Sequence, residues 1–308
     1  MIVEVTAPAT VANLGVGFDV LGLACNEPAD VIRAECIPTP GVIIDAIEGD
    51  DHRLPRDPLK NTAGIAAAYV LKQLGVTEGI KLAIGKGLPL ESGLGSSAAS
   101  AVGAAVAVNA LFGSPLSRTE LLPACLEGEA AVSGRHADNV APSLLGGITL
   151  IVGLDSVYRL PTPPDLYLAL VTPAVSVPTV QARAVLPKMI PLSQMVAQTA
   201  AVGLLVTAIH RGDIALMAAA MERDGIVEPA REHLMPGLRE VRAAARSAGA
   251  LATVISGAGP TLCSICTSRA VANAVSLATE AVYKTLGIPA VTRVTTPSQD
   301  GATVRLVS

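Results

Sequence analysis

Short apolar runs typical of β-strands alternate along the chain with longer, alanine-rich segments typical of helices. The β-branched runs Ile2–Thr6 and Val31–Ile37 predict strands. Asn61–Leu74 predicts a helix with an asparagine N-cap and with Gly75 at its end, and the Ser-x-x-Glu pattern of Ser117–Glu120 predicts another helix start. The same alternation continues through the second half of the chain. The pattern therefore predicts an α+β protein of two domains, each a sheet covered by helices.

A proline-rich segment near the middle of the chain predicts the boundary between these domains. The segment Asp155–Asp165 contains three prolines within four positions, which favours a linker over a regular element. We therefore expect an N-terminal domain over residues 1–155 and a C-terminal domain over residues 156–308.

Composition excludes several classes of partner. The chain has 308 residues, with 22 Lys and Arg against 26 Asp and Glu, so its net charge of −4 argues against a nucleic-acid surface, which must neutralise phosphates. Four Tyr, two Phe and no Trp leave little for base stacking. Charge and aromatic content thus predict no nucleic-acid partner. Apolar residues make up 51% of the chain, which predicts a folded protein with an aliphatic core.

Two stretches of more than twenty residues, Ser92–Ser117 and Met189–Ile209, contain no charged side chain. A membrane-spanning helix needs about 20 strongly apolar residues. The first stretch is rich in Gly, Ala and Ser, and the second contains a proline, a serine and two glutamines. Both are therefore expected to be buried core helices, with no membrane partner.

Cysteine usage and the N-terminus predict a cytoplasmic protein. The five cysteines are an odd number scattered over a long chain, which is typical of a reducing compartment. Met1–Thr6 carries an acidic residue and no basic one, unlike a signal peptide. Cys263 and Cys266 have C-x-x-C spacing but lie inside the apolar run Thr261–Thr267, so we expect a buried strand there and not a metal or redox site.

A glycine- and serine-rich segment, Pro89–Ala99, lies between the predicted strand Ile80–Ile84 and the predicted helix Ala98–Phe112. Its glycines allow the backbone to approach a ligand closely, and the start of the helix presents free N–H groups that favour a phosphate. An ordinary glycine turn with a serine N-cap explains the local pattern equally well.

Two other phosphate-binding motifs do not fit this segment. The P-loop signature G-x-x-x-x-G-K-[ST] is absent from the sequence. Gly93, Gly95 and Ala98 match G-x-G-x-x-[GA], but a dinucleotide-binding unit needs an acidic residue about 20 positions on, at the end of a second strand. The corresponding region, Leu111–Glu120, is a predicted turn and helix start. The sequence around this segment therefore does not fit a dinucleotide-binding unit.

Four motifs occur in order along the chain: Ala7–Asp19, Pro89–Ala99, His136–Pro142 and Ser256–Thr261. Together they resemble the signature of the GHMP small-molecule kinases, and the first and third resemble the homoserine kinases among them. The resemblance covers essentially the whole chain. It implies the two-domain GHMP kinase fold, with a ribosomal-S5-domain-2-like N-terminal half and a ferredoxin-like C-terminal half. It also implies ATP and Mg²⁺ as cofactors, L-homoserine as substrate and a homodimer.

The resemblance assigns the nucleotide and metal contacts. Ser97, with Ser96 as its competitor, and Glu129 are the implied magnesium ligands, although Glu127 lies on the same predicted helix. For Asn61, helix capping explains the residue equally well. The implied nucleotide contacts are Pro89, Leu90, Glu91, Ser92, Gly93, Leu94, Gly95, Ser96, Ser97, Ala98 and Ala99, with Asn61 and Lys86 more loosely.

The resemblance also assigns the substrate contacts. An amino acid carries an ammonium, which suits Asp19, and a carboxylate, which suits the guanidinium groups of Arg183 and Arg231. The alcohol end and its surroundings are expected to be lined by the remaining motif residues, Asn13, His136, Asp138, Asn139 and Gly257.

The proton acceptor is left open by the sequence. Asp138 or His136 could take the hydroxyl proton, or Asn139 could orient the hydroxyl while the proton passes to phosphate. Two other functions also remain. One is a kinase of the same superfamily with a mevalonate- or shikimate-like alcohol, and the other is a nucleotide-binding sensor without catalysis.

Overall fold

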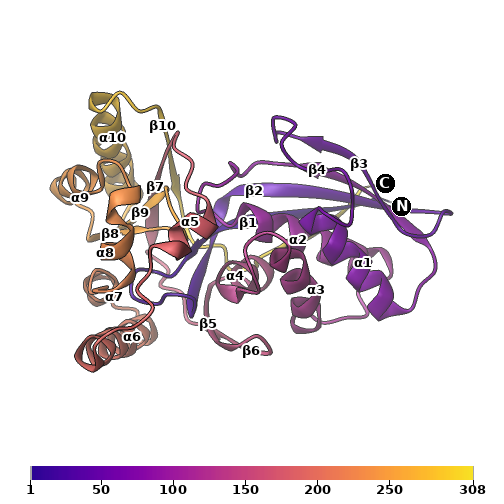
Figure 1. Cartoon of the computed structure of the whole chain (residues 1–308), viewed down its shortest axis with the longest axis horizontal. Coiled ribbons are helices and arrows are strands. Elements are labelled where there is room, and N and C mark those ends of the chain that lie inside the picture. The colour runs from indigo at the N-terminus through magenta and orange to yellow at the C-terminus, as the bar shows by residue number, and fades with distance from the viewer. Residues whose placement is uncertain (1, 308) are drawn as a thin grey trace.

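The computed structural model describes residues 2–307, which form two antiparallel or mixed sheets, each with helices packed against it (Figure 1). This is the α+β architecture that the alternation of apolar runs predicts. The N-terminal helices gather on one face of the larger sheet, and most of the later helices lie along the outer side of the smaller sheet at the other end of the molecule.

The larger sheet has the strand order β11-β1-β2-β4-β3, and β5 extends it from β2 and carries β6. β6 lies inside the proline-rich segment Asp155–Asp165, so the part of that segment before its prolines is a strand of the larger sheet and not the predicted linker. The last strand, β11, also joins the larger sheet, although it lies beyond residue 155 in sequence. The strands are β1 (Ile2–Ala12), β2 (Leu21–Ile37), β3 (Val42–Glu48), β4 (Gly79–Gly85), β5 (Ile148–Gly153), β6 (Ser156–Leu160) and β11 (Thr303–Val307). The helices are α1 (Thr62–Leu74), α2 (Ser96–Leu111), α3 (Arg118–Ala130) and α4 (Ala137–Leu145).

The smaller sheet is antiparallel with the order β10-β7-β9-β8. Its strands are β7 (Tyr167–Pro173), β8 (Ala252–Ile255), β9 (Leu262–Cys266) and β10 (Ala290–Thr295). The helices of this part are α5 (Thr179–Ala184), α6 (Leu192–Arg211), α7 (Ile214–Met221), α8 (Val227–Arg231), α9 (Leu238–Ser247) and α10 (Arg269–Thr285), with a 3₁₀ turn at Glu232–Leu234.

Helix starts follow the predicted capping residues. Asn61 is the N-cap of α1, and its side chain accepts the N–H of Ala63, while Gly75 ends the helix in the left-handed conformation. Ser117 and Glu120 form the predicted capping box at the start of α3. These local signals are short-range, so the sequence alone is enough to place them.

The first two strands are longer than their β-branched cores predict. β1 continues to Ala12, and β2 begins at Leu21, because the two segments pair with each other, Thr10 opposite Ala24 and Ala12 opposite Gly22. Alanine and glycine give little strand signal by themselves, so this pairing is a tertiary effect. It places Asn13 and the turn that follows directly at the end of a central strand.

Small residues let α2 lie close to the larger sheet. A Cβ at Gly103 would meet Ile32 Cγ1 at 2.4 Å, so only glycine fits at this crossing. Nearly every residue of α2 is buried, as the charge-free stretch predicts. The aliphatic core runs without a break from α2 through β1 to Leu168 and Ile265 of the smaller sheet.

The second charge-free stretch is not a buried core helix, and that prediction is wrong. α6 is long and apolar enough to cross a membrane by length and composition alone, but it packs along one stripe against α7 and leaves its other faces open. Leu192 is 72% exposed and Val196 57% exposed. Composition reports how apolar a helix is but not whether the fold provides a partner for each face. Figure 1 shows α6 at the outer edge of the smaller domain.

Cys263 and Cys266 lie on β9 as buried free thiols, as the apolar run around them predicts. Burial raises the pKa of the Cys266 thiol to about 11 and that of Cys263 well above its usual value. Among residues 2–307, no group of three or more His, Cys, Asp or Glu side chains is arranged to hold a metal ion by itself.

Candidate active site

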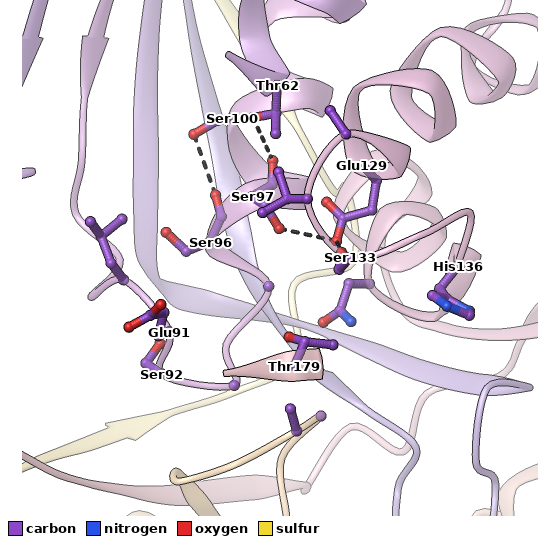
Figure 2. A pocket seen from close by; sticks show the side chains of 18 of the residues that line it. Thr62, Glu91, Ser92, Ser96, Ser97, Ser100, Glu129, Ser133, His136 and Thr179 are labelled. Carbon is purple, nitrogen blue, oxygen red and sulfur yellow. Dashed lines mark hydrogen bonds between the residues drawn. The ribbon is translucent and has the colours of Figure 1, made fainter. Parts of the chain in front are cut away.

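One cavity of about 400 Å³ is lined by residues from all four motifs. Figure 2 shows Ser96 and Ser97 of the second motif and His136 of the third around it. Helix α2 begins at its wall, and α3, α4, α5 and α8 each contribute residues. The cavity is lined by the predicted residues Asn13, Asp19, Asn61, Lys86, Leu90, Glu91, Ser92, Gly93, Gly95, Ser96, Ser97, Glu129, His136, Asp138, Asn139, Arg183, Arg231 and Gly257.

The start of α2 opens onto the cavity through two glycines with positive φ. Gly95 is the N-cap with a φ of 70°, and a Cβ there would lie 2.2 Å from Thr10 Oγ1 and 2.8 Å from Asn139 Oδ1. Gly93 has a φ of 78°, and a Cβ there would lie 2.4 Å from Ser256 O. The two glycines thus bring the loop against the first and fourth motifs. They leave the free N–H groups of the first turn of α2 beside the cavity.

Four loop residues of the predicted set do not line the cavity. Leu94, Ala98 and Ala99 are fully buried, and they anchor the loop and the helix start in the core. Pro89 is half-buried, and its carbonyl accepts a hydrogen bond from Ser92 Oγ at 2.8 Å. These four residues therefore support the conformation of the loop and do not face the cavity.

Lys86 reaches the loop from underneath. Its side chain is 1% exposed and its ammonium donates to Asp30 Oδ2, to Ser96 O at 2.9 Å and to Ser100 Oγ at 2.8 Å. The other oxygen of Asp30 accepts the N–H groups of Gly87 and Leu88. All three N–H bonds of the ammonium are thus engaged within the protein. This buried pair joins β2 and the residue that follows β4 to the first turn of α2.

Asn61 uses both ends of its side chain for the local fold. The amide oxygen caps α1, and the amide nitrogen donates to Pro55 O at 2.8 Å. Of the two explanations that the sequence leaves open, helix capping is the one for which the structure gives contacts.

Glu129 is the carboxylate that faces the loop. Its Oε1 accepts hydrogen bonds from Ser97 Oγ at 3.0 Å and from Ser133 Oγ, and Figure 2 shows these three side chains turned toward one another. Its Oε2 is buried without a hydrogen-bond partner among the described residues. Glu127, the competitor on the same helix, is 40% exposed and pairs with Arg135. Glu129 is therefore the helix carboxylate that lines the cavity.

The environment of Glu129 suits a magnesium ion. Burial raises the pKa of this carboxyl group, while the hydrogen bonds from Ser133 and Ser97 and the charge of Lys86 oppose the rise. A carboxylate oxygen without a partner beside a serine hydroxyl is the hard-oxygen donor set that Mg²⁺ takes, with phosphates and water completing its coordination. The residues present thus fit the metal.

The first motif forms a turn that crosses the end of β1. Asn13 Nδ2 donates to Gly257 O at 3.0 Å, and Asn13 Oδ1 accepts the N–H of Asp19 at 3.2 Å. Asp19 has a φ of 60°, a left-handed conformation that a non-glycine residue seldom adopts. Asn13 thereby ties the first motif to the fourth and holds Asp19 in this conformation.

Asp19 and two arginines form the charged end of the cavity. Arg183 makes a bidentate pair with Asp19, with nitrogen–oxygen distances of 2.7 and 3.0 Å. Arg231 is 2% exposed and donates from Nε to Ala182 O at 3.0 Å and from Nη1 to Gly257 O at 2.8 Å. One carboxylate and two guanidinium groups therefore meet here.

His136 lies beside this cluster, with Nδ1 3.8 Å from Asp19 Oδ2. Burial, and then the charge of Arg183, lower the pKa of its imidazole. The lowered pKa favours a neutral ring, which can accept a hydrogen bond as well as donate one.

Asp138 and Asn139 open α4 at the back of the cavity. Asn139 Oδ1 accepts a hydrogen bond from Thr10 Oγ1 at 2.7 Å, which leaves its amide nitrogen as the group to face a ligand. Asp138 Oδ1 is buried without a partner among residues 2–307. Burial, and then the negative charge of Asp19, raise the pKa of Asp138 to about 7.

Two family models and several curated proteins match the chain. The model of the GHMP kinase N-terminal domain matches residues 61–147, and that of the GHMP kinase C-terminal domain matches residues 205–285. The chain is 42% identical to a homoserine kinase of Chloroherpeton thalassium, over 90% of this chain and 91% of that protein. It is also 42% identical to a homoserine kinase of Arabidopsis thaliana, over 87% and 74% of the two chains.

The chain belongs to the homoserine kinases of the GHMP kinase family. The crystal structure of a homoserine kinase from Cytophaga hutchinsonii superimposes with a TM-score of 0.95 at 44% identity, covering 99% of this chain and 97% of that one. A mevalonate kinase of L. major, solved with R-mevalonate, has a TM-score of 0.74 at 20% identity and shares the fold. The two-domain GHMP kinase fold that the motifs imply is thus confirmed.

The cavity of this homoserine kinase family member also contains polar residues that the motifs do not mark. Arg53 pairs with Glu91 at 2.9 Å, and Thr179 opens α5 opposite the loop (Figure 2). Ser133 follows Glu129 by four positions in the turn after α3, a spacing that could have pointed to it. The unmarked polar residues of the cavity are Arg53, Lys60, Thr62, Ser100, Ser133 and Thr179.

Proposed function

We propose that the chain transfers the γ-phosphoryl group of ATP to the side-chain hydroxyl of L-homoserine, giving O-phospho-L-homoserine and ADP, in the biosynthesis of threonine. The observation that carries the proposal is that one cavity is lined by two groups of residues with different chemistry. One group is a helix start with Ser97 and Glu129, and the other is the Asp19–Arg183–Arg231 cluster. Phosphates fit the first group and an amino-acid zwitterion fits the second.

At the nucleotide end, the N–H groups of the first turn of α2 would bind phosphate oxygens. Ser97 and Glu129 would hold Mg²⁺, which when bound neutralises charge on the phosphates. Lys86 acts from beneath, because its hydrogen bond to Ser96 O fixes the turn that carries these groups. Phosphoryl transfer needs this kind of rigid positioning more than it needs covalent chemistry.

At the substrate end, the charges match a zwitterion group by group. Asp19 would bind the ammonium, and Arg183 and Arg231 would bind the carboxylate. His136 lies within reach of the same cluster. Mevalonate and shikimate carry a carboxylate but no ammonium, so they would leave Asp19 without a substrate partner. The charged end therefore favours an amino acid over these alcohols.

The substrate hydroxyl would lie at Asn139 and Asp138. An N–H of Asn139 donates to the hydroxyl oxygen and leaves the hydroxyl proton free to move to Asp138. Because the pKa of Asp138 is raised to about 7, its carboxylate can hold that proton at neutral pH. A nucleotide sensor would need no such carboxylate, and this observation favours the enzyme.

Release of ADP with four acceptors tests the proposal. With ATP and Mg²⁺, we expect turnover with L-homoserine and none above background with mevalonate, shikimate or no acceptor. Asp19→Asn should raise the KM for L-homoserine by roughly 10- to 100-fold, the cost of losing one charged hydrogen bond. Asp45→Asn, on the exposed edge strand β3, is the matched control. Tight ATP binding without turnover for any acceptor would support a sensor instead.

We also propose that the chain works in the cytoplasm as a homodimer in which a second copy covers the open face of α6. Exposed apolar side chains gather at the start of this helix, with Leu192, Met195 and Val196 all more than 40% exposed. Such a face is costly to leave in water. The absence of a charged residue from Met189 to Ile209 suits contact with an identical copy, where like charges would meet.

Light scattering coupled to size exclusion tests the dimer. The wild-type chain should have twice its monomer mass, and Leu192→Glu combined with Val196→Glu should give a monomer. Leu277→Glu, which places the same charge on the exposed face of α10, should stay a dimer. A wild-type monomer, or a chain that binds phospholipid vesicles through α6, would contradict this part of the proposal.

A further inference from the structure

Phe18 contacts both arginines of the charged end. It lies in the turn after β1, immediately before Asp19, while Arg183 comes from α5 and Arg231 from α8. The Cζ atoms of Arg183 and Arg231 each lie 5.3 Å from the centroid of the Phe18 ring. Both distances are within the range of a cation–π contact. One aromatic ring therefore contacts two guanidinium groups from distant parts of the chain.

Two neighbouring guanidinium groups need something to hold them together. Both carry a positive charge, and burial, followed by the charge of Arg183, lowers the pKa of Arg231. Asp19 pairs with Arg183, but the only acceptors for Arg231 among the described residues are the carbonyls of Ala182 and Gly257. The negative face of an aromatic ring attracts a cation without occupying the N–H groups that a carboxylate needs.

The backbone of the turn fixes the ring in place. Gly17 N donates to Asn13 O at 2.9 Å, and Leu21 N donates to Gly17 O at 2.9 Å, so the turn that carries Phe18 is hydrogen-bonded at both ends. Phe18 also lines an apolar groove with Val16 and Leu186. The backbone hydrogen bonds thus fix the turn that presents the ring to the arginines.

We propose that Phe18 is a positioning residue of the carboxylate subsite, where its ring holds Arg183 and Arg231 at a spacing that lets both face one carboxylate. The inference rests on the proposed function, because it presupposes an amino-acid substrate. It deepens that function by adding a residue that selects for the carboxylate. An aliphatic side chain would bury a similar apolar surface here but has no π face, so it would not hold the two cations.

Ringless variants at this position test the inference. Phe18→Leu and Phe18→Met should each raise the KM and the dissociation constant for L-homoserine about tenfold, with kcat and the KM for ATP changed by less than about twofold. Phe18→Tyr keeps the ring and should stay within about twofold of wild type. Phe112→Leu, at the other phenylalanine of the chain and outside the cavity, is the matched control and should change none of these values.

A second acceptor separates this role from a general structural one. 3-Aminopropan-1-ol is homoserine without its carboxylate, so its kcat/KM, or its dissociation constant if turnover is too slow, should be the same in wild type and Phe18→Leu. Three results would each overturn the inference. The first is an equal loss of affinity for both compounds in Phe18→Leu, and the second is unchanged binding of L-homoserine in the ringless variants. The third is a Phe18→Tyr variant that binds L-homoserine as weakly as Phe18→Leu does.

Calorimetric binding of L-homoserine keeps the inference testable if the proposed function fails. A wild-type chain that binds L-homoserine but does not phosphorylate it would contradict the proposed reaction alone, and the ringless variants would still decide the role of Phe18. A wild-type chain that does not bind L-homoserine would overturn both.

Discussion

Replacing Glu129 by glutamine is expected to lower kcat for L-homoserine by roughly three orders of magnitude. Glutamine has nearly the same shape, but it lacks the negative charge that would hold Mg²⁺ in the proposed site, and a bound metal would supply several kcal/mol of stabilisation to the transition state. Ser97 remains in place, so ATP should still bind at the start of α2. Steady-state kinetics over a magnesium titration, with ATP binding measured by calorimetry, would check the result.

The same substitution should not destabilise the fold. Burial raises the folded-state pKa of Glu129 above its unfolded value, so ionisation of this group costs stability as the pH rises. Glutamine removes that cost, and the Tm of the variant at pH 8 should equal or exceed that of wild type. Glu127→Gln is the matched control, because Glu127 pairs with Arg135 outside the cavity. If Glu127→Gln lost as much activity as Glu129→Gln, the metal assignment would be wrong.

The sequence predicted most reliably those features that depend on neighbouring residues. The caps of α1 and α3 follow from Asn61 and Ser117, whose partners lie within three positions. The role of the loop glycines could be predicted for the same reason, because their positive φ is a local property of the backbone. The four motifs also point to the cavity, since an ordered set of short motifs marks segments that the fold brings together.

Features that depend on distant partners could not be predicted. Lys86 and Asp30 are 56 positions apart, and only the pairing of β2 with β4 brings them under the loop. Phe18 lies inside a predicted motif, but its contacts with Arg183 and Arg231 depend on helices from the other domain. The open face of α6 is a further case, because hydrophobicity alone does not tell a buried face from an exposed one.

Replacing Asp138 by asparagine is expected to lower activity and to raise stability together. If the carboxylate accepts the hydroxyl proton, Asp138→Asn should lower kcat by roughly 10²- to 10⁴-fold. In wild type, kcat/KM should fall as the pH drops through about 7, because Asp138 becomes protonated and can no longer act as a base. The residual activity of Asp138→Asn should lack this acidic limb. Rate–pH profiles of both proteins would check the expectation.

The stability effect has the opposite pH dependence. The folded-state pKa of Asp138 is raised from 3.8 to about 7, so the neutral form is favoured in the fold, and its stabilising contribution is lost as the pH rises through 7. The asparagine amide of the variant carries no charge at any pH. Asp138→Asn should therefore melt several degrees above wild type at pH 8, and at the same temperature as wild type near pH 4 or below.

Taken together, the two profiles distinguish a catalytic base from a buried structural carboxyl group. A structural role predicts the gain in Tm without loss of the acidic limb. Proton transfer directly to phosphate predicts normal kcat in Asp138→Asn, and the base assignment would then be wrong. Asp45→Asn, exposed on β3, should leave both profiles unchanged. A raised Tm with a lost acidic limb would mean that the fold gives up stability at neutral pH to keep a proton acceptor beside the substrate hydroxyl.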